Sequence, residues 1–255
     1  MTTEQLKELA AYSAVDFVRS GMIVGLGHGS TAIYAIRRIG HLIRIGQLVN
    51  VRGVPCSTAA GKEAVQSGIP VEVWDGRLQI DLTIDGADEI DPDLNLIKGG
   101  GGALLREKIV AQASLREIII ADDSKLSPFL GARRAVPVVV TPFGWRSQSF
   151  FLESLGAKPA LRTDPDGKPF ATDEGNFILD CSFGPIPDPA DMADRIRGRA
   201  GIVEHGIWAG VATDVIAAGP WGLKHMKRSP RNENRDNRSG KNGRQHGEEA
   251  GKGGA

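Results

Sequence analysis

Short apolar segments alternate with helix-like segments through the first half of the chain, and this alternation restricts the fold more than any other feature. The segments MIVGLG, LVNVRGVPC, Val71–Trp74, LTIDGAD and EIIIADDS are predicted strands. STAIYAIRRIGHLI, TAAGKEAVQSG and ALLREKIVAQA are predicted helices. The pattern predicts an α/β fold with a mainly parallel, Rossmann-like sheet flanked by helices. In such sheets, ligands bind beyond the carboxyl ends of the strands.

The order of the predicted elements changes after Pro128. RAVPVVV, KPALR, NFILDCSF and IVEHGIW are predicted strands, while WRSQSFFLESLG and DPADMADRIRG are predicted helices. This β-α-β-β-α-β order predicts a smaller, inserted, ferredoxin-like α+β domain at 131–205. GVATDVIAAG is a further strand, so residues 1–130 and 206–227 together are expected to form the catalytic α/β domain.

The last part of the chain, residues 228–255, has almost no apolar side chains and is predicted to be a disordered, polar, basic tail. From Lys227 onward it carries eight Lys/Arg against four Asp/Glu, while the whole chain has a formal net charge of zero. The rest of the chain is therefore slightly acidic, and a specific nucleic-acid partner is not expected.

The two cysteines, Cys56 and Cys181, form no CxxC pattern, which disfavours a disulfide framework or a zinc site and fits a reducing compartment. The N-terminal residues lack the apolar core of a signal peptide. No apolar run approaches the ~20 residues of a membrane span. A cytoplasmic protein without a membrane partner is therefore expected.

The first candidate site is the loop Gly25-Leu26-Gly27-His28-Gly29-Ser30-Thr31, where a strand ends and a helix begins. Free N–H groups at the helix start and two hydroxyls favour an anion, and phosphate is the natural ligand. A plain tight turn is the alternative. A dinucleotide site is disfavoured, because no Asp or Glu occurs between Thr31 and Lys62 to bind a ribose hydroxyl.

The second candidate site follows the predicted strand LTI, where Asp85 and Asp88 lie closest to the strand end. Clustered carboxylates raise one another's pKa and can hold or pass protons of sugar hydroxyls. A Mg²⁺ site is the rival interpretation. A solvated acidic loop is favoured for Glu89, Asp91 and Asp93.

The third candidate site is Lys98 with the four glycines that follow it, and Glu107 in the next helix. Consecutive glycines indicate a close approach of the backbone to a ligand. Lys98 can neutralise an oxyanion. Partial burial of Glu107 between small neighbours would raise its pKa toward that of a useful base. A surface Glu107 paired with Lys108 or Arg106 is the alternative.

With these three motifs, the chain resembles ribose-5-phosphate isomerase of type A. IVGLGxGSTA, TIDGADEID and KGGGGALxREKIVA match its signature blocks in order and spacing, and ADDSK is similar to a fourth. The resemblance continues through VTPFGW, LESLGAKPALR, DEGNFILDC and VEHGIW to about Lys227. It implies interconversion of ribose 5-phosphate and ribulose 5-phosphate without a metal or organic cofactor, by a homodimer, with a tetramer as the alternative.

The resemblance also assigns roles to residues. Glu107 shuttles a proton between C2 and C1 through an enediolate, and Lys98 steadies the negative charge. Asp85 and Asp88 contact the sugar and move hydroxyl protons. The expected substrate-binding residues are Lys7, His28, Gly29, Ser30, Thr31, Asp85, Gly86, Ala87, Asp88, Lys98, Gly99, Gly100, Gly101 and Lys125, with the phosphate held by Ser30, Thr31, Lys7 and Lys125.

His28 departs from the family, which usually has a small hydroxyl residue at this position. A protonated His28 would strengthen phosphate binding, a neutral one would narrow the site, and a solvent-facing one would do neither.

Three other classes of protein compete with the isomerase. A non-catalytic sugar-phosphate-sensing domain would keep the phosphate loop without needing Glu107, and it would carry a DNA-binding head, for which about 20 residues before the first strand are too few. A dehydrogenase is disfavoured by the missing acidic residue. A CoA-transferase-like relative would need its nucleophilic glutamate in a different context.

Overall fold

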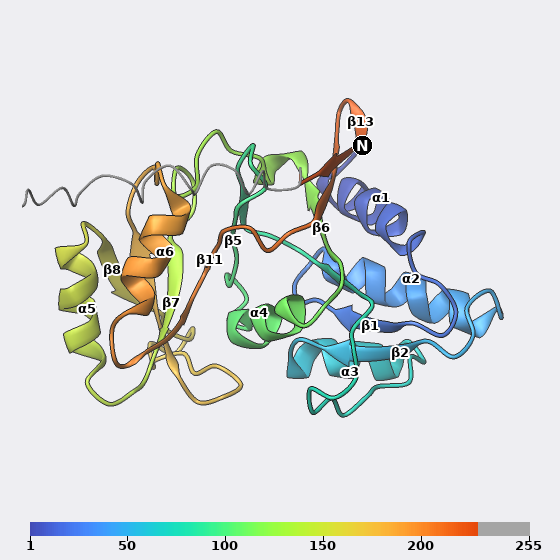
Figure 1. Ribbon diagram of the computed structural model, residues 1–255, viewed down its shortest axis with the longest axis horizontal. Helices are drawn as coiled ribbons and strands as arrows, with labels where there is room; N and C mark the ends of the chain where they lie inside the picture. The colour runs from blue at the N-terminus through green and yellow to red at the C-terminus, as the bar shows by residue number, and fades with distance from the viewer. Residues whose placement is uncertain (229–255) are drawn as a thin grey trace, which may run out of the picture.

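The computed structural model describes residues 1–228 as two parts side by side, each built on its own sheet (Figure 1). The helices are α1 (Thr3–Val15), α2 (Ala32–Arg44), α3 (Thr58–Gln66), α4 (Leu104–Gln112), α5 (Trp145–Ser154) and α6 (Pro189–Arg197), with a short 3-10 turn η1 (Asp123–Lys125).

The larger part is built on a six-stranded sheet with the order β13-β12-β6-β3-β1-β2. Its strands are β1 (Ile23–Leu26), β2 (Arg52–Pro55), β3 (Leu82–Asp85), β6 (Glu117–Asp122), β12 (Asp214–Gly219) and β13 (Gly222–Lys227). All neighbouring pairs are parallel except the β12–β13 hairpin. The strands of the parallel sheet therefore point their carboxyl ends at one edge, as the alternating sequence pattern predicted.

Helices cover both faces of this sheet because alternate strand residues point to opposite sides. Ile118 and Ile120 of β6 pack in the core shared with α1, α2 and α3. Ile119, between them, packs in another core with Ala111 of α4. The opposite faces of one buried strand thus hold α1 and α4 on either side of the sheet.

The smaller part is built on a four-stranded antiparallel sheet with the order β10-β7-β9-β8. Its strands are β7 (Val136–Val140), β8 (Lys158–Leu161), β9 (Phe177–Ser182) and β10 (Ile202–His205). Leu152 of α5 and Ile196 of α6 pack on one face, while Val139 and Ile178 on the other face meet Leu104 of α4. This is the predicted ferredoxin-like order, and the predicted fold class is confirmed.

A third, three-stranded sheet joins the two parts and was not predicted. It consists of β4 (Glu89–Ile90), β5 (Leu96–Ile97) and β11 (Ile207–Trp208), in the order β11-β5-β4. The segment IVEHGIW, predicted as one strand, is divided at Gly206 between this sheet and the small one. The Gly206 N–H donates to Pro137 O, and the Gly206 carbonyl accepts from the Lys98 N–H, so one glycine links β7 to the end of β5.

Two other strand predictions differ from the structure. Val71–Trp74 is not a strand: Val71 alone forms an isolated bridge, to Gly53, and Val73 is 93% exposed. The edge strand β13 was missed because GLKHMK is largely polar and exposed and lacks a strand-like apolar pattern. The predicted domain boundaries stay a prediction. The predicted tail, apart from Arg228, lies outside the described residues.

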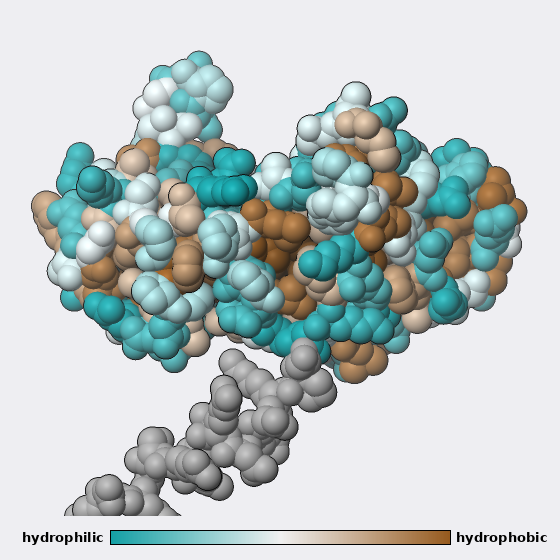
Figure 2. All heavy atoms as spheres, turned by 90° about the horizontal axis from the view of Figure 1, so that it is seen from above, coloured by the Kyte–Doolittle hydropathy of each residue, from teal (hydrophilic) through white to brown (hydrophobic). Residues whose placement is uncertain are grey.

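The described helices include none that is long and apolar enough to cross a membrane. Figure 2 shows polar residues over much of one face, with an apolar region in the middle where the two parts meet. The junction between the parts is therefore a packed contact as well as the place where β5 and α4 meet the small sheet.

Candidate active site

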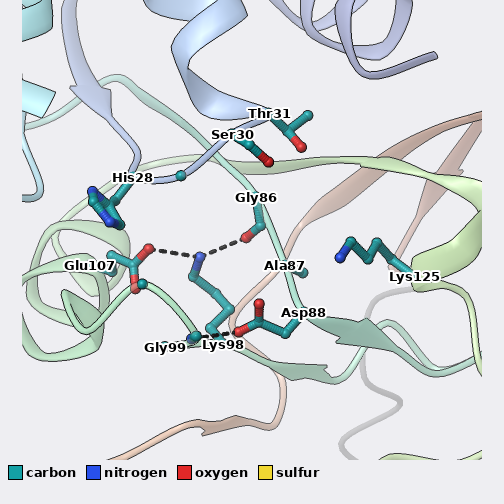
Figure 3. Close-up of a pocket in the computed structure, with 13 residues that line it drawn as sticks. His28, Ser30, Thr31, Gly86, Ala87, Asp88, Lys98, Gly99, Glu107 and Lys125 are labelled. Carbon is teal, nitrogen blue, oxygen red and sulfur yellow. Dashed lines mark hydrogen bonds and ion pairs between the residues drawn. The ribbon is translucent and has the colours of Figure 1, made fainter. Parts of the chain in front are cut away.

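One cavity collects residues from all three sequence motifs at the carboxyl ends of β1 and β3 (Figure 3). The loop after β1, the loop after β3, the glycine loop after β5 and helix α4 form its walls, and η1 closes one side. The lining residues are His28, Gly29, Ser30, Thr31, Gly86, Ala87, Asp88, Lys98, Gly99, Gly100, Gly101, Glu107 and Lys125.

Backbone contacts fix the loop between β1 and α2 against the end of β3. The His28 N–H donates to Asp85 Oδ1 at 3.0 Å, and the Gly27 N–H donates to Ile84 O at 3.0 Å. A Cβ at Gly27 would overlap Asp85, which explains the glycine there. Gly29 has φ +109°, a conformation that glycine adopts readily. The sequence thus allows the loop to pass directly over the strand end.

Donors for an anion gather where α2 begins. Thr31 occupies the N-cap position but its side chain makes no capping hydrogen bond, and Ser30 is exposed beside it. The first N–H groups of a helix lack intrahelical partners and carry partial positive charge. Lys125 of η1 faces this end of the cavity from another wall (Figure 3). These groups can bind a phosphate.

Lys98 lies at the opposite end of the cavity between two carboxylates. Its Nζ is 2.9 Å from Asp85 Oδ2 and 3.1 Å from Glu107 Oε1, and it donates to the Gly86 carbonyl at 2.6 Å. All three charged side chains are at most 4% exposed. The Asp85 Oδ1 atom accepts the N–H groups of His28 and Gly86, so this carboxylate is held from both sides.

The buried cluster changes the acidity of both side chains that line the cavity. Burial raises the pKa of Glu107 to about 8, although the charge of Lys98 opposes that rise. Burial alone would lower the pKa of Lys98, but the charges of Asp85 and Glu107 outweigh it and raise that pKa above its usual value. Glu107 is therefore close to the acidity of a working base near neutral pH, beside a permanent cation.

The four-glycine segment is shaped around Asp88 and His28. The Gly100 N–H donates to Asp88 Oδ2 at 2.8 Å, and a Cβ at Gly100 would press on that carboxylate. A Cβ at Gly101 would overlap the imidazole of His28. Gly99 has φ +107°. Gly100 and Gly101 thus bring the backbone close to side chains on the cavity wall.

His28 lies on the cavity wall and does not point into solvent. Its Nδ1 is 2.9 Å from Ser57 Oγ, and the same hydroxyl accepts the Ala60 N–H as the N-cap of α3. The Ser57 hydroxyl can donate to Nδ1 or accept from it, so the tautomer of His28 determines whether Nε2, beside Gly101, donates or accepts.

Two predicted site residues do not line the cavity. Lys7 pairs with Glu4 through an Nζ–Oε1 contact of 2.8 Å on α1. Asp85 is fully buried behind Lys98. The alternative pairing of Glu107 with its helix neighbours does not occur, since Glu107 contacts Lys98.

Sequence reasoning missed two residues that support the walls. Ser57 contacts His28, and its position before the helix Thr58–Gln66 is a visible N-cap signal. Arg162 binds the glycine segment from the small sheet. No local pattern predicts this contact, because its partners are about 60 residues away.

A loop that offers backbone and hydroxyl donors faces a buried lysine–glutamate pair, an arrangement that fits an enzyme that moves protons on a phosphorylated substrate. Comparisons with known proteins agree. Residues 52–222 match the family model of ribose 5-phosphate isomerase A (phosphoriboisomerase A). The ribose-5-phosphate isomerase A of Chloroflexus aurantiacus is 54% identical over 89% of this chain and 95% of its own length. That of Desulfatibacillum aliphaticivorans is 51% identical over 89% and 99%.

Solved structures give the same family. A D-ribose-5-phosphate isomerase in complex with phospho-erythronic acid superposes with a TM-score of 0.88 and 38% identity, covering 89% of this chain and 100% of the other. Ribose 5-phosphate isomerase from Plasmodium falciparum gives 0.85 and 39%, covering 88% and 98%. The chain therefore belongs to the ribose 5-phosphate isomerase A family, which confirms the predicted family and enzyme class.

Proposed function

We propose that this chain interconverts D-ribose 5-phosphate and D-ribulose 5-phosphate through an enediolate, with Glu107 carrying the proton between C2 and C1. The observation that carries the proposal is the 3.1 Å contact between Glu107 Oε1 and Lys98 Nζ, in a cavity whose far end gathers donors for a phosphate. A base beside a fixed cation, with a separate anchor for the substrate, is what isomerisation next to a carbonyl requires.

The phosphate anchor sets the direction of the substrate. The start of α2, with Ser30 and Thr31, and the ammonium group of Lys125 receive the phosphate. The sugar then extends toward Lys98 and Glu107 at the other end of the cavity. The carbonyl end of the open-chain sugar consequently lies beside the base.

The proton transfer conserves every atom of the sugar. Glu107 removes the proton from C2 of the aldose, the C–H electrons form the C1–C2 double bond, and the carbonyl electrons move onto O1. Lys98 Nζ stabilises this negative charge. Glu107 returns the proton to C1 while the O2 hydroxyl loses its proton and becomes the carbonyl, and the O2 proton ends on O1. The product is the ketose.

Asp85 and Asp88 have separate proposed roles. Asp88 lines the cavity and is the candidate for moving the hydroxyl protons. Asp85 was expected to touch the sugar as well, but its burial and its 2.9 Å contact with Lys98 favour a role in holding the lysine charged and in place. Mg²⁺ binding by these aspartates is the rival interpretation, and full activity after exhaustive chelation would remove it.

The structural relative solved with phospho-erythronic acid supports this substrate class. That ligand carries a carboxylate as well as a phosphate, so it offers two separate anions. The cavity described above also has two cationic regions, at Lys125 and at Lys98. The proposed intermediate would likewise place two negatively charged groups, its phosphate and its enediolate oxygen, at the two ends of the cavity.

Glu107→Gln tests the proposed base. We expect kcat to fall by about 10³-fold, because the amide cannot accept the C2 proton, while ribose 5-phosphate still binds. The acidic limb of the wild-type kcat/KM profile, expected near pH 8, should disappear with the carboxyl group. Initial rates across pH and isothermal titration calorimetry of the variant measure both effects.

The matched control is Glu117→Gln, since Glu117 is equally buried but does not line the cavity. We expect its turnover to stay within about twofold of the wild type. Near-normal turnover of Glu107→Gln would overturn the assignment of the base. Wild-type protein that binds ribose 5-phosphate without converting it would favour the alternative, a sugar-phosphate-sensing domain.

We also propose a homodimer, with a tetramer as the alternative. Large apolar side chains outside the cavity support an interface: Phe143 is 94% exposed and Phe150 is 68% exposed. Light scattering after size-exclusion chromatography measures the mass directly. The cytoplasmic location stays a prediction.

A further inference from the structure

Arg162, which directly follows β8 of the small sheet, reaches into the larger part and binds the glycine segment of the cavity. Its Nη1 donates to the Gly99 carbonyl at 3.0 Å and to the Gly100 carbonyl at 3.1 Å. Both glycines line the cavity, but Arg162 itself does not. The guanidinium therefore holds the outer side of a wall whose inner side faces the substrate.

The guanidinium is itself locked in place. Asp180 of β9 accepts two hydrogen bonds from it, Nε to Oδ2 at 2.9 Å and Nη2 to Oδ1 at 2.5 Å. The ring of Phe170 lies 5.8 Å from its central carbon. The Arg162 side chain is 15% exposed. A paired, mostly buried arginine fork has a fixed direction, so it can impose its geometry on the carbonyls it binds.

Binding the carbonyls turns the following N–H groups toward the cavity. In a trans peptide the C=O and the next N–H point in opposite directions. The Gly99 carbonyl points to Arg162, and the Gly100 N–H accordingly points inward and meets Asp88 Oδ2. The Gly100 carbonyl also points to Arg162, so the Gly101 N–H points inward too.

The Gly101 N–H is left without a hydrogen-bond acceptor among residues 1–228. Gly101 lies on the cavity wall next to the imidazole of His28. An inward, unpaired backbone donor at that place suits an anionic or hydroxyl oxygen of the bound sugar phosphate.

Within the segment of four glycines, one backbone hydrogen bond supports this shape, from the Gly102 N–H to the Gly99 carbonyl at 3.0 Å. Glycine loses more conformational freedom on ordering than any other residue. If the segment were free in the unliganded protein, each substrate molecule would have to order it on binding. An arginine that orders it beforehand removes that cost from substrate binding.

We propose that Arg162 is a positioning residue of the active site: it preorders the glycine segment so that the Gly101 N–H binds the sugar phosphate. The inference rests on the proposed function for the identity of the ligand. Lys98 is held by Asp85 and the Gly86 carbonyl, and Glu107 is held by Lys98; Arg162 contacts none of these groups. Arg162 therefore acts on substrate binding far more than on the proton transfer.

Arg162→Ala tests the proposal through two measurements. The first is steady-state kinetics with ribose 5-phosphate: we expect KM to rise by about tenfold and kcat to stay within about threefold of the wild type. The second is hydrogen–deuterium exchange of the peptide that contains Gly99–Gly102. Its exchange should become faster in the unliganded variant and slow again when ribose 5-phosphate is added.

Two further variants make the result specific. Arg162→Lys keeps the charge but lacks the planar fork, so its KM and exchange should lie between those of the wild type and of Arg162→Ala. Arg106→Ala removes another link between the two parts of the molecule, the Nε–Glu174 Oε1 contact of 2.5 Å, and touches no glycine of the segment. Its KM should remain within about twofold of the wild type.

An unchanged KM in Arg162→Ala overturns the proposal. A raised KM with unchanged exchange also overturns it, because that pair of results indicates direct contact with the ligand. If Arg162→Ala does not fold, Arg162→Lys decides by the same two measurements. A wild-type protein that lacks isomerase activity would refute the proposed function alone, since the exchange experiment would still report whether Arg162 orders the glycines.

Discussion

Two buried lysines lie near the ring of Trp208, but their surroundings shift their pKa values in opposite directions. Lys98 Nζ lies 5.1 Å and Lys108 Nζ 5.8 Å from the ring centroid. Lys98 is 2% exposed and Lys108 is 3% exposed. The two lysines are therefore nearly equal in burial and in aromatic contact. Their pKa values differ because their ammonium groups contact different charged groups.

Lys98 meets two carboxylates and Lys108 meets one. The charges of Asp85 and Glu107 overcome burial and raise the pKa of Lys98. For Lys108, burial is the largest effect and lowers the pKa, and the Glu204 carboxylate offsets it only in part. A second carboxylate thus decides whether a buried lysine is held firmly in its charged form.

The free directions of the two ammonium groups also differ. Lys98 lines the cavity and can meet a substrate oxygen. The three donors of Lys108 are taken by Glu204 Oε1 at 2.7 Å, His205 O at 2.6 Å and Ile207 O at 3.2 Å. Lys98 can therefore contact a ligand, while Lys108 ties α4 to β10 and β11.

Lys98→Met should have the largest effect and concerns turnover. We expect kcat to fall by about 10³-fold or more, because the enediolate loses its cation in a buried site. The pKa of Glu107 should rise further, since Lys98 now lowers it. Single-turnover rates across pH measure both changes. Turnover of Lys98→Met within tenfold of the wild type would show that Lys98 matters no more for turnover than Lys108 does.

Lys108→Met should affect stability and spare turnover. Removing one partner of a buried ion pair leaves Glu204 and two carbonyls unpaired, which costs roughly 3 kcal/mol. Urea unfolding at one protein concentration measures the loss. Lys108→Met with Glu204→Gln should recover part of it, since no charge is left unpaired. A kcat more than tenfold below the wild type in either variant would contradict the structural role.

The same two lysines show what the sequence could predict. Lys98 was predicted to be a site residue because it precedes four glycines. The predicted parallel sheet supported this, because ligands bind beyond the carboxyl ends of its strands. Lys108 was considered as a surface partner of Glu107. In the structure the small sheet covers α4, and Lys108 is buried and contacts Glu204 instead. Local patterns report spacing along a helix and not which face another sheet will cover.

Contacts between distant segments account for the remaining gaps. In the β4–β5–β11 sheet, β11 (Ile207–Trp208) pairs with β5 (Leu96–Ile97), which lies far earlier in the chain. Each of these strands has only two residues, and strands so short show no periodicity in the sequence. Arg162 likewise acts on glycines about 60 residues earlier. The motifs that line the cavity are contiguous and could be predicted, while the residues that support them are brought together only by the fold.

A third carboxyl group near Lys98 sharpens the comparison, since it makes no ion pair of the kind that Asp85 makes with this lysine. Glu117, at the start of β6, is 1% exposed, and neither of its carboxyl oxygens has a hydrogen-bond partner among the described residues. Burial raises its pKa well above the usual value, the Asp85 charge adds to the rise, and Lys98 opposes it. Glu117 therefore binds its proton more tightly in the folded protein than in the unfolded chain.

The consequence for stability has a definite sign. Above the unfolded pKa, the unfolded chain releases the Glu117 proton while the folded protein keeps it. The free energy of unfolding accordingly decreases as pH rises toward the folded pKa, by about 1.4 kcal/mol for each unit by which the fold raises the pKa. Glu117→Gln cannot ionise in either state, so this contribution disappears in the variant.

Glu117→Gln should therefore gain stability relative to the wild type as the pH increases from 5 to 8, with turnover unchanged. The gain is the change in the variant's free energy of unfolding relative to that of the wild type between these two pH values, measured by urea unfolding at each pH. Glu4→Gln is the control of opposite sign: hydrogen bonds from Lys7 and Tyr34 lower the pKa of Glu4, so its loss should cost stability at the higher pH. A pH-independent difference for Glu117→Gln would mean that Glu117 is charged, and that Lys98 supports three carboxylates instead of two.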